Sequence, residues 1–253
     1  MKYYEKMLEL GCFNKRTVME MTGSEAAAKS LLYDYQKKGY IEKIKRDFYA
    51  VISLETRQPV LSRYQIGSLM FPDAVITHHS AFEAFGYANQ VFYEVYVATD
   101  FRFRDFEYNG IWYHHMERKA HADIASNGKL RVTGIEQTIV DSIKDFNKIA
   151  GLEEVVRCMM LVPSVKEEKI LEALSAYNNK FLYQKCGYIM EQLQDELGLG
   201  NDFFKYLGRH VTDGKRYLIK ENGDNVWNPK WRLYVPADFM HLIDKGVGDY
   251  DAI

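Results

Sequence analysis

The chain has 253 residues, of which 47% are hydrophobic and 27% are charged, and its formal net charge is −2. This composition is that of a folded protein and excludes an intrinsically disordered chain, and the length favours two domains. No segment approaches the roughly 18 apolar residues of a transmembrane helix, and the N-terminus lacks the apolar run of a signal peptide. We therefore expect a cytoplasmic protein without a membrane partner.

The distribution of charge and the cysteines indicate what kind of protein this is. Residues 1–50 contain ten basic and seven acidic side chains, whereas the rest of the chain is net acidic. A basic segment on an acidic body favours a nucleic-acid-binding module joined to another domain. The three cysteines, Cys12, Cys158 and Cys186, are odd in number and widely spaced. We expect them to be buried free thiols rather than disulfides or zinc ligands.

The first 50 residues predict three short helices and a hairpin. Gly11 ends the first helix, Asn14 is the expected N-cap of the second, and Ser24 caps the third after a break at Thr22-Gly23. Apolar residues with helical spacing form the inner face of the third helix: Ala28, Leu31, Leu32 and Tyr35. Residues 40–52 predict two strands around a polar turn. This order is that of a winged helix-turn-helix, which we place at residues 1–55.

Residues 60–253 predict a mixed α/β domain with strands early and helices late. The expected helices are 62–70, 79–85, 135–146, 151–161, 166–176, 180–197 and 201–208. The expected strands are 74–77, 92–98, 103–108, 110–116, 130–133 and a last pair near 214–220 and 230–235. The predicted fold class is α+β, with an N-terminal winged helix-turn-helix followed by this mixed α/β C-terminal domain.

The third helix has the features of a DNA-recognition helix. Its outer face is small and polar, so the helix can enter the major groove closely, and lysines stand where they can reach phosphate or guanine. The basic residues of the hairpin tip and of the second helix would contact the flanking backbone. The predicted DNA contacts are Lys15, Arg16, Ser24, Glu25, Lys29, Ser30, Tyr33, Lys43, Lys45 and Arg46. Two alternatives remain open: these charges form an ordinary solvated surface, or the winged helix binds another protein.

Five histidines, His78, His79, His114, His115 and His121, invite a metal hypothesis. Adjacent histidines on a strand point to opposite faces, and no His-x-x-x-His or Cys-x-x-Cys spacing supports them. We therefore expect no metal site, and expect His78 to cap a helix or to make a core hydrogen bond. We also expect no cofactor.

Two further functional alternatives depend on the second domain. The acids Glu94, Asp100, Glu136 and Asp141 would serve a metal-dependent enzyme that processes nucleic acid, with the winged helix delivering the substrate. Such acids also occur as surface ion pairs and caps in most α/β domains, and no phosphate-binding or nucleophile motif accompanies them. The third possibility is a ligand-responsive transcription factor, whose aromatic-rich second domain would hold an effector.

Segments along nearly the whole chain carry a family resemblance. They are Lys45-Arg46-Asp47-Phe48-Tyr49, residues 76–86 (ITHHSAFEAFG), residues 93–98 (YEVYVA), residues 133–141 (TGIEQTIVD), residues 183–191 (YQKCGYIME) and residues 231–235 (WRLYV). In this order they resemble the AbiEi-type antitoxins of type IV toxin–antitoxin systems, which are linked to abortive infection by phage. Asp47 stands where the family has a glycine in the wing turn; Asp tolerates left-handed backbone better than most residues do.

The resemblance implies a non-enzymatic protein with two activities. The winged helix would bind inverted repeats in its own promoter and repress its operon. The second domain would counter a nucleotidyltransferase toxin, without forming a stable complex with it.

Overall fold

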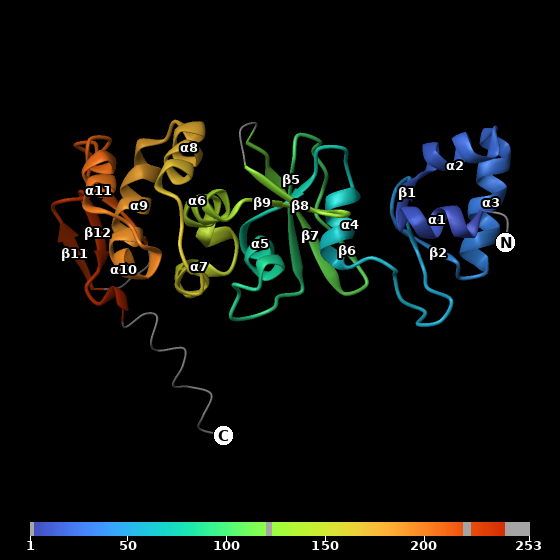
Figure 1. Cartoon of the computed structure of the whole chain (residues 1–253), viewed down its shortest axis with the longest axis horizontal. Helices are drawn as coiled ribbons and strands as arrows, with labels where there is room; N and C mark the ends of the chain where they lie inside the picture. Colours follow the sequence, from blue (N-terminus) through green and yellow to red (C-terminus); the bar gives the residue numbers. More distant parts are fainter. Residues whose placement is uncertain (1–2, 120–122, 220–223, 241–253) are drawn as a thin grey trace, which may run out of the picture. The chain divides into compact units, whose positions relative to one another are not determined.

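The computed structural model describes residues 3–119, 123–219 and 224–240 (Figure 1). Along the chain, three helices and a small sheet come first, a six-stranded sheet follows, and a set of helices with a last small sheet ends the described part. The fold is α+β with an N-terminal winged helix-turn-helix, as the sequence predicts. Within the described ranges, no helix combines the length and apolar character needed to cross a membrane.

The winged helix consists of α1 (Tyr4–Leu10), β1 (Cys12–Asn14), α2 (Lys15–Thr22), α3 (Glu25–Lys37), β2 (Ile41–Lys45) and β3 (Phe48–Val51), blue in Figure 1. Its strands pair antiparallel in the order β1-β3-β2. The helices enclose a core that includes Met7, Val18, Leu32 and Ile41. The Tyr4 hydroxyl donates a buried hydrogen bond to the backbone oxygen of Ile52 at 2.7 Å, which joins α1 to the end of the wing.

The six-stranded sheet has the order β6-β7-β5-β4-β9-β8. Its strands are β4 (Val75–Ile76), β5 (Glu94–Thr99), β6 (Phe106–Tyr108), β7 (Ile111–Glu117), β8 (Ile124–Asn127) and β9 (Leu130–Thr133). The pairs β5–β7 and β4–β9 are parallel, whereas β6 and β7 form an antiparallel hairpin. At the hairpin turn both Asn109 and Gly110 have positive φ, the requirement of a tight two-residue connection.

Helix α4 (Arg63–Leu69) packs closely against this sheet. Ser62 caps it with a reciprocal capping box to Gln65. A Cβ on Gly67 would lie 2.8 Å from the Ile76 side chain and 3.1 Å from that of Val97, so a larger residue here would force these side chains to shift.

The remaining helices are α5 (His78–Phe85), α6 (Ile135–Asp145), α7 (Gly151–Met160), α8 (Glu167–Tyr177), α9 (Lys180–Glu191), α10 (Gln194–Leu197) and α11 (Asn201–Gly208). A short 3-10 turn, Phe146–Lys148, precedes α7. The last sheet, in the order β10-β12-β11, is formed by β10 (Arg216–Tyr217), β11 (Asn225–Asn228) and β12 (Leu233–Pro236). One continuous apolar core joins these helices and this sheet, with Phe82, Ile139, Met159, Ile189 and Trp231 among its members.

The chain forms two compact units, each assembled from three segments. One comprises Met1–Ile76, Phe92–Glu117 and Ala125–Val132; the other comprises Thr77–Val91, Arg118–Ile124 and Thr133–Ile253. The sequence analysis divides the chain into residues 1–55 and 60–253. The compact units are interleaved along the chain and do not test this boundary, so it stays a prediction.

Four local features differ from the prediction. The strands β1, β8 and β11 are not predicted, because each spans only three or four residues without regular alternation of buried and exposed side chains. The helix expected at 180–197 is interrupted between α9 and α10. Leu193 at this interruption is fully buried, so apolar spacing continues across the break and does not reveal it.

Candidate nucleic-acid interface

The turn between α2 and α3 is built as the sequence predicts. Gly23 has a φ of 79°, in the left-handed region that ends a helix sharply. The Thr22 hydroxyl donates back to the Val18 carbonyl at 2.8 Å, and the Ser24 Oγ accepts from the Ala27 amide at 3.2 Å. Helix α3 therefore begins immediately after α2 ends, and its N-terminal turn is fixed by its own cap.

Helix α3 presents one face to the core and one to solvent. Ala28, Leu32 and Tyr35 are buried, whereas Leu31, which was expected on the inner face, is only partly buried. The exposed side follows helical spacing and carries Glu25, Ala26, Lys29, Ser30 and Tyr33. Tyr33 is 69% exposed although it is aromatic. The outer face thus carries small side chains near its start and an exposed aromatic hydroxyl further along.

An exposed acid links the two helices of the motif. Glu25 Oε1 lies 2.8 Å from Lys15 Nζ and 3.1 Å from Lys29 Nζ. The hydrogen bonds from Lys15 and Lys29 lower the pKa of Glu25 to about 2, and in return the pKa of Lys15 is raised. Two predicted phosphate contacts are therefore held by one carboxylate in the free protein.

The wing is fixed to the N-terminus of α2. Asn14 caps α2 by accepting from the Thr17 amide at 2.9 Å, as predicted. The next amide, that of Lys15, donates to the Asp47 carbonyl in the wing turn at 3.1 Å. Asp47 has a φ of 57°, so aspartate occupies the left-handed position without glycine. Arg16 is strongly exposed beside this junction, with its Nε 3.1 Å from Glu20.

A β-bulge changes which wing residues face solvent. The pairing of β2 with β3 shifts between Lys43 and Lys45. The extra residue, Ile44, is buried, so strict alternation of buried and exposed residues fails here. Lys43 and Arg46 remain exposed, and the Arg46 side chain is 96% exposed.

Lys45 differs from the other predicted contacts. Its ammonium lies 3.9 Å from the centre of the Phe71 ring and 5.1 Å from that of Phe103. Burial lowers the pKa of Lys45 to about 8. The side chain therefore binds an aromatic surface of its own unit, which no pattern near Lys45 in the sequence indicates. The DNA contact predicted for Lys45 stays a prediction, and a phosphate would have to compete with these two aromatic rings for the ammonium.

The structure thus brings most of the predicted contacts to solvent. Eight of the ten are exposed: Arg16, Ser24, Glu25, Lys29, Ser30, Tyr33, Lys43 and Arg46. Lys15 and Lys45 are partly buried.

The four acids proposed for a metal-dependent enzyme that processes nucleic acid lie in separate surroundings. They are Glu94, Asp100, Glu136 and Asp141. Glu94 begins β5 and Asp100 follows its end. Glu136 accepts from the Lys166 amide at 2.9 Å, and Asp141 accepts from the Thr77 hydroxyl at 3.0 Å. These are structural hydrogen bonds, and no observation on these acids favours catalysis.

The ligand-responsive alternative receives no specific support either. A pocket of about 410 Å³ lies in the unit that holds the winged helix, between Phe13, Thr17 and Phe71. The charged side chain lining it is Arg131, whose guanidinium donates to the carbonyls of Ser68 and Pro72. An effector would have to compete with these bonds.

The histidines have individual partners. His114 Nδ1 lies 2.7 Å from Asp105 Oδ2, and His115 Nε2 lies 3.2 Å from the Thr99 carbonyl. Thr77, not His78, occupies the N-cap position of α5, so of the two roles expected for His78 the structure shows the contact in the core. His78 Nε2 lies instead 3.5 Å from a carboxylate oxygen of Asp145 in the core. His121 lies outside the described residues.

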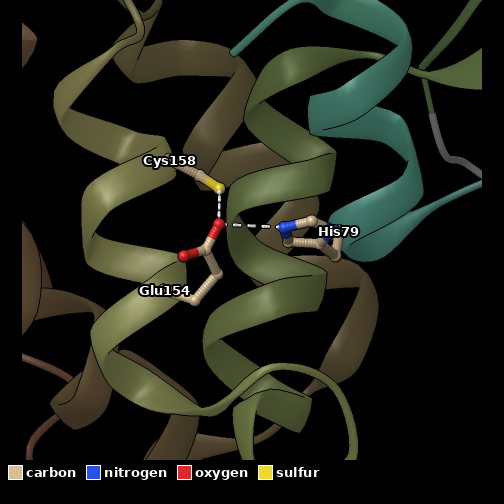
Figure 2. A group of neighbouring side chains, drawn as sticks. All are labelled: His79, Glu154 and Cys158. Atoms are coloured by element: carbon tan, nitrogen blue, oxygen red, sulfur yellow. Dashed lines mark hydrogen bonds and ion pairs between the residues drawn. The ribbon is translucent and has the colours of Figure 1, made fainter. Parts of the chain in front are cut away.

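His79 belongs to a cluster that the sequence analysis misses. In the described part of the chain, His79, Glu154 and Cys158 form the one group of at least three His, Cys, Asp or Glu side chains whose candidate ligand atoms all lie within 4.8 Å of one another (Figure 2). The spacing of Glu154 and Cys158, four residues apart on a helix, is the signal that could have indicated it.

No protein-family model matches the chain, and no curated protein matches it. Among solved structures, the chain is similar to the RV2827C protein from Mycobacterium tuberculosis, with a TM-score of 0.62 and 14% sequence identity. The match covers 94% of this chain and 89% of that chain. At this identity the likeness shows a shared fold alone.

Proposed function

We propose that the chain binds duplex DNA through α3 and the β2–β3 wing and acts as a transcriptional regulator in the cytoplasm. The observation that carries the proposal is the exposed face of α3, which is small at its start and followed by Lys29 and Ser30. The wing adds exposed Lys43 and Arg46, and the Lys15–Asp47 backbone bond fixes it to the same motif. Cations on a capped helix and a neighbouring hairpin are suited to neutralise phosphates on both sides of a groove.

The narrower proposal is an antitoxin that represses its own operon. It rests on the resemblance to AbiEi-type antitoxins of type IV systems. On this proposal the winged helix recognises inverted repeats upstream of the gene, and the rest of the chain opposes a nucleotidyltransferase toxin without a stable complex. The chain would then need neither a cofactor nor catalytic residues.

A binding experiment tests the DNA proposal. The full chain is titrated into labelled duplex from upstream of its own gene, with a shuffled duplex as competitor, over a series of salt concentrations. We expect salt-sensitive binding, which Lys29→Ala and Arg46→Ala weaken while each reduces the salt slope by about 1. Lys205→Ala is the matched control, because Lys205 is an exposed helical lysine that pairs with Asp202 at 2.7 Å as Lys29 pairs with Glu25. Absence of binding at low salt would refute the proposal.

Growth measurements test the antitoxin proposal separately. The full chain is co-expressed with a nucleotidyltransferase encoded beside it, and growth is compared with that of cells expressing the toxin alone. We expect rescue by the wild type and equally by the double variant Lys29→Ala/Arg46→Ala, because the repression surface lies on the winged helix. Failure of the wild type to rescue would remove the antitoxin role and leave DNA binding intact.

A further inference from the structure

Three ligand-type side chains converge in the helical core of the unit that contains α5 and α7. His79 comes from the first turn of α5, and Glu154 and Cys158 come from α7 (Figure 2). Their exposed fractions are 1%, 5% and 0%, so bulk solvent does not reach them. Figure 2 shows the Glu154 carboxylate between the thiol and the imidazole.

The distances between these atoms are those of a metal coordination sphere. Glu154 Oε1 lies 3.0 Å from His79 Nε2 and 3.5 Å from Cys158 Sγ. Tetrahedral zinc, with bonds of about 2.0–2.1 Å to N or O and 2.3 Å to S, separates N from O ligands by about 3.3 Å and S from O ligands by about 3.6 Å. The two separations seen here are slightly shorter than these values, so the Glu154 oxygen would move away from both neighbours to admit an ion.

The helices hold the three groups in place. Glu154 and Cys158 are four residues apart and therefore project from the same face of α7. His79 is fixed on a different helix, and Phe82, one turn further along α5, belongs to the same apolar core as Cys158. A ligand bound by all three would cross-link α5 to α7.

Outer partners complete the pattern of a metal site. Glu83, one turn after His79 on α5, has Oε1 3.1 Å from His79 Nδ1, the ring nitrogen that does not face Glu154. A carboxylate on the second nitrogen orients an imidazole for metal binding and fixes its tautomer. Burial raises the pKa of the Cys158 thiol, and a backbone hydrogen bond from Asn89 acts in the opposite direction.

We propose that His79 Nε2, Glu154 Oε1 and Cys158 Sγ bind one Zn²⁺ ion. A set of one nitrogen, one oxygen and one sulfur ligand suits zinc, whereas calcium and magnesium require oxygen ligands. Three protein ligands leave one tetrahedral position, which a water molecule can fill. On binding, Cys158 loses its thiol proton and His79 loses the proton on Nε2, and both protons are released, so the sulfur coordinates as thiolate and the ring nitrogen through its lone pair. The ion would cross-link α5 and α7 within the helical core.

Metal content and cobalt spectroscopy test the proposal on the full chain. Protein expressed with added zinc and then dialysed should contain about one Zn²⁺ per chain by elemental analysis. Protein freed of metal and titrated with Co²⁺ should develop a thiolate-to-cobalt charge-transfer band. The band should be absent in Cys158→Ala and retained in Cys186→Ala, the matched control, because Cys186 is equally buried in the same core.

A variant that keeps all three ligands distinguishes weaker zinc binding from loss of the fold. Glu83→Gln should lower the zinc affinity about 10- to 100-fold without abolishing the cobalt band. Added Zn²⁺ should also raise the melting temperature of metal-free wild type, and should do so less in Glu83→Gln at the same concentration. A folded wild type that retains no zinc and shows no thiolate band would overturn the proposal. Persistence of the band in folded Cys158→Ala would overturn it as well.

Discussion

Glu25 Oε1, in the first turn of α3, lies 2.8 Å from Lys15 Nζ, in the first turn of α2. The same oxygen lies 3.1 Å from Lys29 Nζ, so one exposed acid holds two cations of the proposed DNA surface. A phosphate that approaches either lysine must displace this carboxylate and meets its negative charge.

Replacement of this acid should therefore strengthen DNA binding. In Glu25→Gln a repulsive charge is removed and both lysines become available, so the affinity for any duplex should rise at low salt and the salt dependence should steepen. Fluorescence anisotropy over a salt series measures both. Asp34→Asn is the control, because Asp34 pairs with Lys38 at the other end of α3. A loss of affinity restricted to the operator would instead show that Glu25 reads a base.

Lys45 should contribute less to DNA binding than its neighbours in the wing. Its ammonium lies over the Phe71 ring, so a DNA phosphate would have to compete with this contact. Lys45→Met should keep the DNA affinity within about twofold, whereas Lys43→Ala and Arg46→Ala should each reduce the salt slope by about 1. Anisotropy titrations at pH 7 compare the three. An equal loss in Lys45→Met would mean that Lys45 leaves the aromatic rings on binding.

Asp145 should make the fold sensitive to acid. Burial alone would raise the pKa of this carboxyl, but hydrogen bonds from His78, Lys144 and Lys148 outweigh burial and hold the pKa well below its usual range. The folded-state pKa lies below the unfolded value of 3.8, so this stabilisation is present above pH 4 and is lost as the pH falls further.

Urea unfolding of Asp145→Asn measures this contribution. The substitution should reduce the free energy of unfolding by about 2 kcal/mol at pH 7, because it removes charge-assisted hydrogen bonds from a buried site. The difference from wild type should shrink towards pH 2. Asp202→Asn, which changes an exposed acid paired with Lys205, should leave unfolding unchanged at both pH values. A difference for Asp145→Asn that does not vary with pH would contradict the assignment.

Gly187 should be intolerant of any side chain. A Cβ at this position of α9 would lie 2.1 Å from the Trp231 ring, which is fully buried. Two hydrogen bonds hold Trp231 in place. The ring Nε1 donates to Glu191 at 2.7 Å, and the backbone carbonyl of Trp231 accepts from the Gln184 side chain at 2.9 Å. Gly187→Ala should therefore cost about 3 kcal/mol in chemical denaturation. Gly208→Ala, at a helical glycine with no atom within 4 Å, should be neutral or stabilising.

Local signals in the sequence predict local structure well in this chain. Asn14 and Ser24 have side chains that accept amide hydrogen bonds, so both caps are visible from residue type and position. The Asn109-Gly110 turn is equally clear, because few other pairs tolerate two positive φ values. By contrast, the bulge that buries Ile44 depends on strand pairing and has no sequence signal of its own.

The surroundings of Lys45 and of His79 could not be predicted, because they depend on contacts between residues that are far apart in the sequence. Lys45 meets Phe71 and Phe103, which are far from it in sequence, so its exposure could not be inferred from the alternation in the wing. His79 is 75 residues from Glu154, and metal motifs are recognised by short spacing. The exposed face of α3 was predictable, since helical periodicity alone separates Lys29 from Leu32.

The interleaving of the two compact units determines how this protein can be dissected. The chain passes from one unit to the other at five junctions: Ile76–Thr77, Val91–Phe92, Glu117–Arg118, Ile124–Ala125 and Val132–Thr133. A fragment ending at residue 91 would keep β4 but lose both of its hydrogen-bonded neighbours, β5 and β9. Its bare strand edges would invite aggregation. A fragment cut within the interleaved region would therefore lose sheet structure, and point substitutions in the intact polypeptide are the way to separate the two proposed activities.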